Sequence, residues 1–181
     1  MEDISLHILD VAENGIMAGA DLIRISVEEN SAGDRLTVAI EDNGRGMSPE
    51  FLKSVMDPFV TTRKTRKVGL GLSLFQQSVQ EAEGEMNITS KPGVGTTLNA
   101  TMKRSHIDRK PLGDLAGTML CLIEGNADID FVFDYSVDDR SYCLDTREIR
   151  CVIEDIPLNH PSVIRLIRDN LITGMKEINQ A

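Results

Sequence analysis

The chain has 181 residues, which suits one domain or one domain with a small appendage. Hydrophobic residues make up 41% of the chain, enough for a core, but aromatic residues only 4%, so aliphatic side chains must supply most of the packing. The formal net charge of −10 disfavours nucleic acid as a partner, because phosphate contacts need clustered Lys and Arg.

The three cysteines, Cys121, Cys143 and Cys151, form no C-x-x-C pair and have no His at ligand spacing. We expect reduced, mostly buried thiols and no metal bound by them. No apolar run approaches the length of a membrane span, and the N-terminus begins with acidic residues instead of a basic signal region. These features predict a cytoplasmic protein that does not contact membranes.

The first part of the chain predicts a helix and then a hairpin. Residues 3–18 carry apolar side chains at three- and four-residue steps, and Gly19 ends the pattern. Alternating β-branched residues predict strands at Leu22–Glu28 and Leu36–Glu41. Ser48 followed by Pro49 predicts the start of a short helix that reaches about residue 55.

Residues 58–69 have no apolar period and predict a long loop, either a functional lid or a disordered segment. A helix at Leu70–Glu83 and strands at Glu85–Ser90 and Thr96–Met102 follow. The order α-β-β-α-α-β-β predicts an α+β fold, with helices on one face of a mixed, mostly antiparallel sheet.

The polar residues 104–112 predict a linker, so we place one domain at 1–104 and a C-terminal α+β extension at 105–181. The extension should contain a helix, a hairpin turning at Asp138-Asp139, and two closing helices. The expected bounds are 112–124 for the helix, 129–137 and 141–144 for the strands, and starts near 146 and 162 for the last helices. The extension could dock a protein partner, form a homodimer, or act as a purely structural addition.

Four short features occur in order along the predicted domain. Each alone has an ordinary explanation as a helix surface, a turn or a loop-to-helix junction. They are Asp10-Val11-Ala12-Glu13-Asn14, Asp42-Asn43-Gly44-Arg45-Gly46-Met47, Gly69-Leu70-Gly71-Leu72-Ser73 and Gly93-Val94-Gly95-Thr96-Thr97.

Together, these features have the chemistry of an adenine-nucleotide site for ATP with magnesium. Asp10 and Asn14 share one helix face and offer oxygen atoms, which a hydrated Mg²⁺ prefers. Asp42 follows a strand beside glycines, where its carboxylate can accept a hydrogen bond from the exocyclic amine of adenine. The glycines at 69–71 would direct backbone N–H groups at phosphates, and basic residues of the loop such as Lys64 would add countercharge. No phosphate-binding G-x-x-x-x-G-K-[ST] or dinucleotide G-x-G-x-x-G pattern is present.

The four features resemble, in order, the boxes of the GHKL ATPases, the superfamily of DNA gyrase, the large heat-shock chaperones, histidine kinases and MutL-type mismatch-repair proteins. Asn14 matches the Asn box, and the three glycine boxes match Asp42-x-Gly44-x-Gly46, Gly69-x-Gly71 and Gly95-Thr96-Thr97. Residues 58–63 with 68–73 are most similar to sensor histidine kinases, whereas residues 14–20 are more similar to the mismatch-repair branch. The resemblance covers residues 1 to about 104 and implies a two-layer Bergerat-type fold.

The resemblance also implies roles. Asn14 would chelate magnesium, Asp42 would bind the adenine amine, and residues 58–69 would close over the phosphates. Met47 would line the adenine pocket, and Thr97 would support the contact to Asp42. The remaining nucleotide-binding candidates belong to the same boxes and loop: Gly44, Gly46, Thr62, Lys64, Gly69, Leu70, Gly71 and Leu72.

Hydrolytic members of the superfamily carry Glu four residues before the Asn, as the base that activates water, whereas this chain has Asp10. Asp is one methylene shorter, which argues against fast hydrolysis. Phosphoryl transfer to another protein needs mainly positioning and charge neutralisation. We therefore expect a stand-alone kinase, similar to anti-sigma-factor kinases, that phosphorylates a protein partner. An ATP- or ADP-responsive module without transfer and a slow ATPase using Asp10 remain alternatives.

The segment Ser105-His106-Ile107-Asp108-Arg109-Lys110-Pro111-Leu112 resembles the S-H-x-x-R-x-P-L acceptor box of histidine kinases. It follows the ATP domain instead of preceding it, and its acidic residue stands one place late. A polar linker before a helix is therefore the favoured explanation, and His106 stays a secondary acceptor candidate.

Overall fold

Six strands form one mixed sheet in the order β3-β4-β2-β1-β5-β6 in the computed structural model, which describes residues 2–54 and 71–179. Every neighbouring pair is antiparallel except β1 and β5, which run parallel. In chain order the elements are α1 (Ile4–Met17), β1 (Leu22–Asn30), β2 (Arg35–Asp42), α2 (Pro49–Ser54), α3 (Gly71–Glu81), β3 (Glu85–Lys91), β4 (Gly95–Lys103), α4 (Leu115–Gly125), β5 (Asp130–Val137), β6 (Arg140–Asp145), α5 (Thr146–Ile153) and α6 (Pro161–Asn179).

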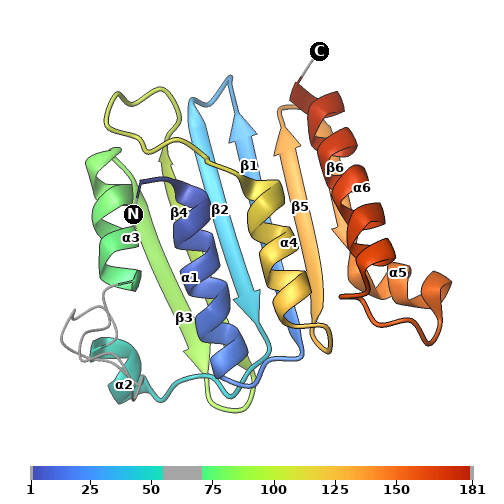
Figure 1. Cartoon of the computed structure of the whole chain (residues 1–181). Coiled ribbons are helices and arrows are strands. Elements are labelled where there is room, and N and C mark those ends of the chain that lie inside the picture. The colour runs from blue at the N-terminus through green and yellow to red at the C-terminus, as the bar shows by residue number, and fades with distance from the viewer. Residues whose placement is uncertain (1, 55–70, 180–181) are drawn as a thin grey trace.

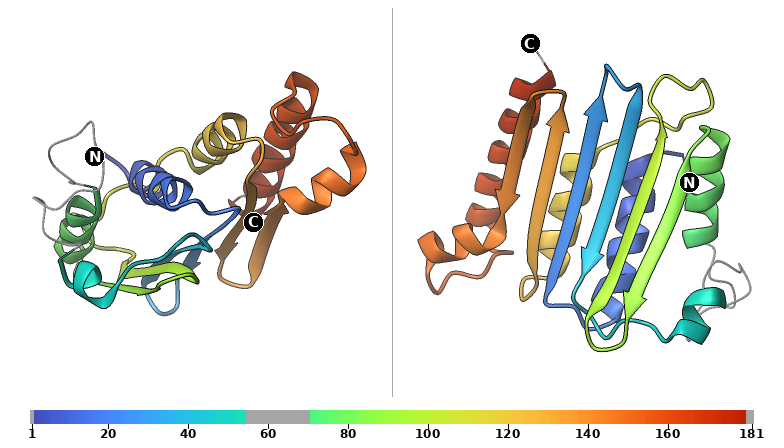
Figure 2. Two further views of the ribbon diagram at one scale, coloured as in Figure 1. Left: turned by 90° about the horizontal axis from the view of Figure 1, so that it is seen from below. Right: turned by 180° about the vertical axis from the view of Figure 1, so that it is seen from behind.

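Helices α1, α3 and α4 lie side by side on one face of the sheet (Figure 1). Seen from below, the two layers separate clearly, and the view from behind shows the opposite face of the strands uncovered by described residues (Figure 2). The predicted α+β fold with helices on one face is therefore confirmed. Among the described residues, no helix is both long and apolar enough to cross a membrane.

Strands β1 and β2 form the centre of the sheet, and their side chains alternate between its two faces. Ile25 on β1 lies opposite Ile40 on β2, and both are buried on the helix face. In the turn between the strands, the Asn30 side chain accepts a hydrogen bond from the Gly33 N–H at 2.6 Å. Because neighbours along a strand point to opposite faces, the register also fixes which polar residues reach the helix side.

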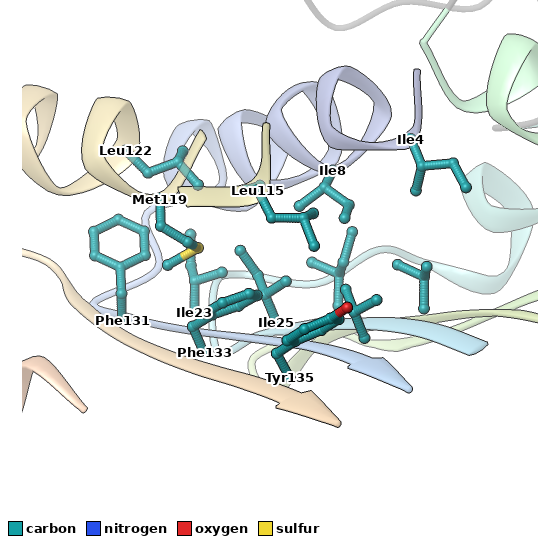
Figure 3. Packing of buried hydrophobic residues seen from close by; sticks show 14 of the residues in the cluster. Ile4, Ile8, Ile23, Ile25, Leu115, Met119, Leu122, Phe131, Phe133 and Tyr135 are labelled. Atoms are coloured by element: carbon teal, nitrogen blue, oxygen red, sulfur yellow. The ribbon is translucent and has the colours of Figure 1, made fainter. Parts of the chain in front are cut away.

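The residues after 104 continue the same sheet and core. On β5, Phe131 and Phe133 lie opposite Ile23 and Ile25 of β1, and all four are almost fully buried. Figure 3 shows these side chains beneath α1 and α4. Leu115, Met119 and Leu122 of α4 point into the same cluster as Ile4 and Ile8 of α1. The hairpin of β5 and β6 thus completes the hydrophobic core under the N-terminal helix.

The polar stretch expected as a linker is held in place by hydrogen bonds. The carbonyls of Pro111 and Leu112 accept from the N–H groups of Ile4 and Ser5, each at 2.9 Å. These bonds satisfy N–H donors in the first turn of α1, which a helix leaves without intrahelical partners. The start of α1 and the path into α4 are therefore fixed together.

At the end of the sheet away from the glycine-rich turns, a polar network joins β1, β5 and α6. Glu29 accepts from Arg104 Nε at 2.8 Å and from the Tyr135 hydroxyl at 3.0 Å. The Tyr135 hydroxyl also lies 3.1 Å from Asn179 Oδ1 in the last turn of α6. Burial, followed by the nearby Glu29 charge, raises the pKa of Tyr135 to about 12.

The expectation of mostly buried cysteines was wrong. Cys121, Cys143 and Cys151 are all free and exposed. Cys143 lies on the uncovered face of β6, where partial burial and a hydrogen bond to Asp134 raise the pKa of its thiol to about 11. A pattern of three isolated thiols does not reveal which face of a strand or helix they occupy.

Replacing Phe133 with Ala should lower the free energy of unfolding by about 3–5 kcal/mol, since the ring is fully buried and the cavity cannot refill. The neighbouring exposed residue supplies the control, and Asp134→Ala should change stability by less than about 1 kcal/mol. Urea unfolding followed by circular dichroism measures both, and one cooperative transition is expected. A separate early transition for the C-terminal half would contradict a shared core.

Candidate functional site

Asp42 ends β2 and lies between two neighbouring strands, opposite Ile23 on β1 and Thr96 on β4. Its carboxylate accepts a hydrogen bond from the Gly44 N–H at 2.9 Å and others from the N–H and hydroxyl of Thr96. Burial, the largest influence, raises the pKa of Asp42, although these hydrogen bonds oppose it. A half-buried acceptor thus lies at the end of the sheet.

The loop after Asp42 passes between α1 and the turn that joins β3 to β4. Gly44 is buried so closely against Ala18 that a Cβ on it would lie 2.9 Å from the Ala18 Cβ. Gly46 has φ +64°, and a Cβ there would overlap the Lys91 carbonyl, so only glycine suits this position. The first glycine box therefore allows two segments of backbone to meet around the carboxylate.

Ser90 links the first and last glycine boxes. Its hydroxyl accepts from the Met47 N–H at 2.8 Å and donates to the Gly95 carbonyl at 2.9 Å. The Thr96 hydroxyl oxygen lies 3.0 Å from the Ser90 hydroxyl oxygen. Sequence reasoning did not single out Ser90, because its role arises only when the two loops face each other.

Helix α1 reaches this cluster through Gly15. A Cβ on Gly15 would lie 2.8 Å from the Cβ of Asp42, tighter than real side chains allow. Asn14 precedes Gly15 on the helix and is half-buried, so the Asn box and the Asp42 carboxylate are neighbours. Asp10 lies one turn earlier on α1, on the same helix face as Asn14.

Helix α3 packs against α1 beside Asp10. The carboxylate of Asp10 lies so close to Gly71, the first residue of α3, that a Cβ on Gly71 would overlap it. One turn further along α3, the Phe75 ring stacks on His7 of α1 with centroids 4.8 Å apart and an interplanar angle of 16°. Leu72 is half-buried and packs against the core.

The side chain of Asn43 links the end of β2 to the start of β1 by hydrogen bonds. Its side-chain oxygen accepts from the N–H groups of Asp21 and Leu22, both at 3.0 Å, and its amide donates to Asp21 Oδ1 at 2.5 Å. Three hydrogen bonds from one side chain fix the direction in which the chain leaves the sheet. Asn43 therefore positions Asp42, a role that the sequence motif alone did not indicate.

The support expected from Thr97 comes instead from Thr96. Thr96 lies opposite Asp42 and donates to its carboxylate, whereas Thr97 lies opposite Glu41. Successive side chains of a strand point to opposite faces, so Thr97 faces away from the helices. It lines a shallow hollow at this end of the sheet, whose lining also includes Glu41 and Asp42 itself.

Four of the expected nucleotide-binding residues lie outside the described part of the chain, as does the whole expected lid of residues 58–69. They are Thr62, Lys64, Gly69 and Leu70. His106 follows β4 at the end opposite Asp42, since the Lys103 carbonyl accepts from the His106 N–H and Lys103 pairs with Arg35. Seven residue steps along β4 separate Thr96, the partner of Asp42, from Lys103, which is roughly 23 Å at strand spacing.

The described residues contain no group of three or more His, Cys, Asp and Glu that could hold a metal ion by itself. Magnesium commonly uses one or two protein oxygens and completes its coordination with water and substrate phosphates. Asn14 and Asp10, on one face of α1, fit that requirement, with Asn14 adjacent to the Asp42 cluster.

Comparison with known proteins agrees with this geometry. Residues 2–106, more than half of the chain, match the family described as histidine kinase-, DNA gyrase B-, and HSP90-like ATPase. The chain belongs to this family. The GHKL resemblance seen in the motifs is thereby confirmed.

Among curated relatives, the signal transduction histidine-protein kinase AtoS of Escherichia coli is 36% identical over 98 residues, 54% of this chain and 16% of its own length. The non-motile and phage-resistance protein of Caulobacter vibrioides is 32% identical over 98 residues, 51% of this chain and 12% of its own length. The matched part of the chain thus covers less than a fifth of the length of each of these relatives.

Among solved structures, the Aquifex aeolicus MutL ATPase domain complexed with ADP superposes with a TM-score of 0.57 at 12% identity. The alignment covers 93% of this chain and 88% of that domain. At such identity the likeness shows the fold alone. It extends past the family match at residue 106, as does the continuous sheet.

The buried His7 generates a pH prediction. Its ring is 2% exposed, both nitrogens are without hydrogen-bond partners among the described residues, and burial lowers its pKa from 6.5 to about 4. In the unfolded chain His7 is therefore protonated below about pH 6.5, whereas in the folded chain it is protonated only below about pH 4. Stability should fall as the pH falls through this window, by up to about 3 kcal/mol.

Urea unfolding at pH 7 and pH 4.5 measures this loss. His7→Phe keeps the stack on Phe75 without a titrating group, so it should remove this part of the pH dependence. The same change at exposed His160 is the control and should leave the pH dependence in place. An unaltered pH profile in His7→Phe would show that His7 is not the group responsible.

Proposed function

We propose that this protein binds ATP with magnesium and transfers the γ-phosphate to a protein partner. The observation that supports the proposal most is the convergence of the boxes. The Asn box, the first glycine box and the last glycine box meet around the Asp42 carboxylate, and the described part of the second glycine box meets α1 at Asp10. Family membership supports adenine nucleotide as the ligand.

Each residue has a role in the proposed complex. Asp42 accepts a hydrogen bond from the adenine amine, with Gly44, Gly46 and Met47 forming the loop beside the ring. The first turn of α3, at Gly71 and Leu72, offers N–H groups to the phosphates. Asn14 holds magnesium, which would neutralise phosphate charge. Thr62, Lys64, Gly69 and Leu70 are proposed to complete the phosphate contacts.

Transfer is favoured over fast hydrolysis by the position of Asp10. A general base must lie within hydrogen-bond reach of the water it activates. The Asp10 carboxylate contacts the start of α3 and has the shorter of the two acidic side chains. A slow ATPase using Asp10, and a regulatory module that binds ATP or ADP without transfer, are the alternative functions.

The acceptor is proposed to belong to another protein. His106 lies at the opposite end of β4 from Asp42, too far for transfer from a nucleotide bound to the same chain. The residues from 105 to 181 present exposed surfaces on α5 and α6, which would bind the partner or a second copy of this chain.

Asp42→Asn should weaken ATP binding roughly tenfold or more, since the variant removes a charged acceptor of the adenine hydrogen bond. Glu41→Gln is the matched control, because Glu41 is the preceding residue of β2, and successive side chains of a strand point to opposite faces of the sheet. Calorimetric titration of each variant measures the affinity, and thermal melting checks folding. Equal loss in both variants would contradict the adenine assignment.

Incubation with γ-³²P-labelled ATP separates the three functions. Label on a second protein in extract, abolished by Asp42→Asn, supports transfer. Release of labelled phosphate without protein labelling indicates the slow ATPase. Tight binding with neither product indicates the regulatory module. Acid-labile label on this protein that His106→Ala removes would overturn the assignment of the acceptor to another protein.

A further inference from the structure

The half-buried hydroxyl of Ser90 lies between two loops, next to the threonine that donates to Asp42. It accepts a hydrogen bond from the Met47 N–H at 2.8 Å, and the Gly95 carbonyl lies 2.9 Å away as an acceptor. The Thr96 hydroxyl oxygen is 3.0 Å from the Ser90 oxygen. Ser90 thus has one neighbour that donates to it and two oxygen atoms to which it can donate.

The direction of the hydroxyl protons follows from counting them. A Ser or Thr hydroxyl has a single proton to donate. The Thr96 hydroxyl donates its proton to the Asp42 carboxylate, which as a charged group is the stronger acceptor. Toward Ser90, Thr96 can then only accept, so the Ser90 proton is shared between the Gly95 carbonyl and the Thr96 oxygen. The donors from Met47 to Thr96 therefore all point toward Asp42.

The same counting leaves the Asp42 carboxylate one position for a ligand. An ionised carboxylate has about four acceptor positions. Donors from the described residues fill three of them: the Gly44 N–H, the Thr96 N–H and the Thr96 hydroxyl. Burial raises the pKa of Asp42, and hydrogen bonds to its charged form oppose that effect. As long as the carboxylate stays charged, its remaining position accepts a proton donor and offers none.

We propose that Ser90 is a positioning residue that restricts the nucleotide site to bases with an amine facing Asp42. Ser90 acts through Thr96: its donated proton strengthens the hydrogen bond from Thr96 to Asp42, because linked hydrogen bonds polarise one another. The carboxylate is thereby held as an acceptor, which suits the amine of adenine and opposes the carbonyl of hypoxanthine. This inference rests on the proposed nucleotide function and adds to it a selection among purine bases.

Calorimetric titration of Ser90→Ala with ATP and with inosine triphosphate tests the proposal. The variant should bind ATP about threefold to tenfold more weakly, the effect of weakening one hydrogen bond. Its affinity for inosine triphosphate should stay the same or rise, since a carboxylate held less firmly in its charged form can donate to a carbonyl. The preference for ATP should therefore fall. A merely structural Ser90 would weaken both nucleotides equally, so an unchanged preference would overturn the proposal.

Two control variants accompany this measurement. Ser90→Thr keeps a hydroxyl at this position and should keep the preference for ATP. Thr89→Ala removes a hydroxyl from the neighbouring exposed position, whose side chain points to the other face of the sheet, and should leave both affinities unchanged. Thermal melting checks the folding of each variant. If Ser90→Ala does not fold, Ser90→Cys replaces it, because a thiol is only a weak donor.

A double-mutant cycle tests whether Ser90 acts through Thr96. Thr96→Val removes the hydroxyl and should itself lower the preference for ATP. In that background Ser90→Ala should lower the preference little further, a non-additivity expected of residues in contact. Additive reductions would overturn the proposed route. If the unchanged protein binds neither nucleotide, the proposed function and this inference fail together. If it prefers ATP and Ser90→Ala keeps that preference, only this inference fails.

Discussion

The structure of the site depends on how closely α1 can approach the end of β2. Gly15 allows the helix backbone to lie against Asp42, since a Cβ there would come within 2.8 Å of the Asp42 Cβ. That approach desolvates the carboxylate, raises its pKa, and leaves the Gly44 and Thr96 groups as its hydrogen-bond donors. An acceptor that is partly desolvated and already oriented binds a complementary donor more strongly than one in water. The glycines and the carboxylate therefore act as one unit.

A second constraint comes from outside the matched family region. The hairpin of β5 and β6 adds Phe131 and Phe133 to the core beneath α1, and α4 packs beside α1 on the same sheet face (Figures 1 and 3). Hydrogen bonds from Ile4 and Ser5 to residues 111 and 112 fix the start of α1 to the same region. The helix that carries Asp10 and Asn14 thus depends on the C-terminal residues for its position.

The sequence was informative where the signal is local. Helix starts, alternating strands and glycine turns depend on neighbouring residues, so most elements and the four boxes could be predicted from the pattern and the resemblance. The parallel pairing of β1 with β5 joins residues over a hundred positions apart, and no periodicity encodes such a contact. Thr96 contacts Asp42 where Thr97 was expected. The difference reflects the strand register, because a shift of one residue moves a side chain to the other face of a sheet. The roles of Ser90 and Asn43 arise from loops meeting in space, which a motif does not show.

The central claim is that the Asp42 carboxylate recognises the amine of adenine. Calorimetric titration with ATP and with inosine triphosphate tests it most directly, because inosine carries a carbonyl oxygen where adenine carries the amine. The account predicts that ATP binds at least about a hundredfold more tightly, since the carbonyl would leave the carboxylate unpaired and facing another acceptor. Equal affinity for the two nucleotides would contradict the assignment of Asp42 and, with it, the proposed orientation of the nucleotide.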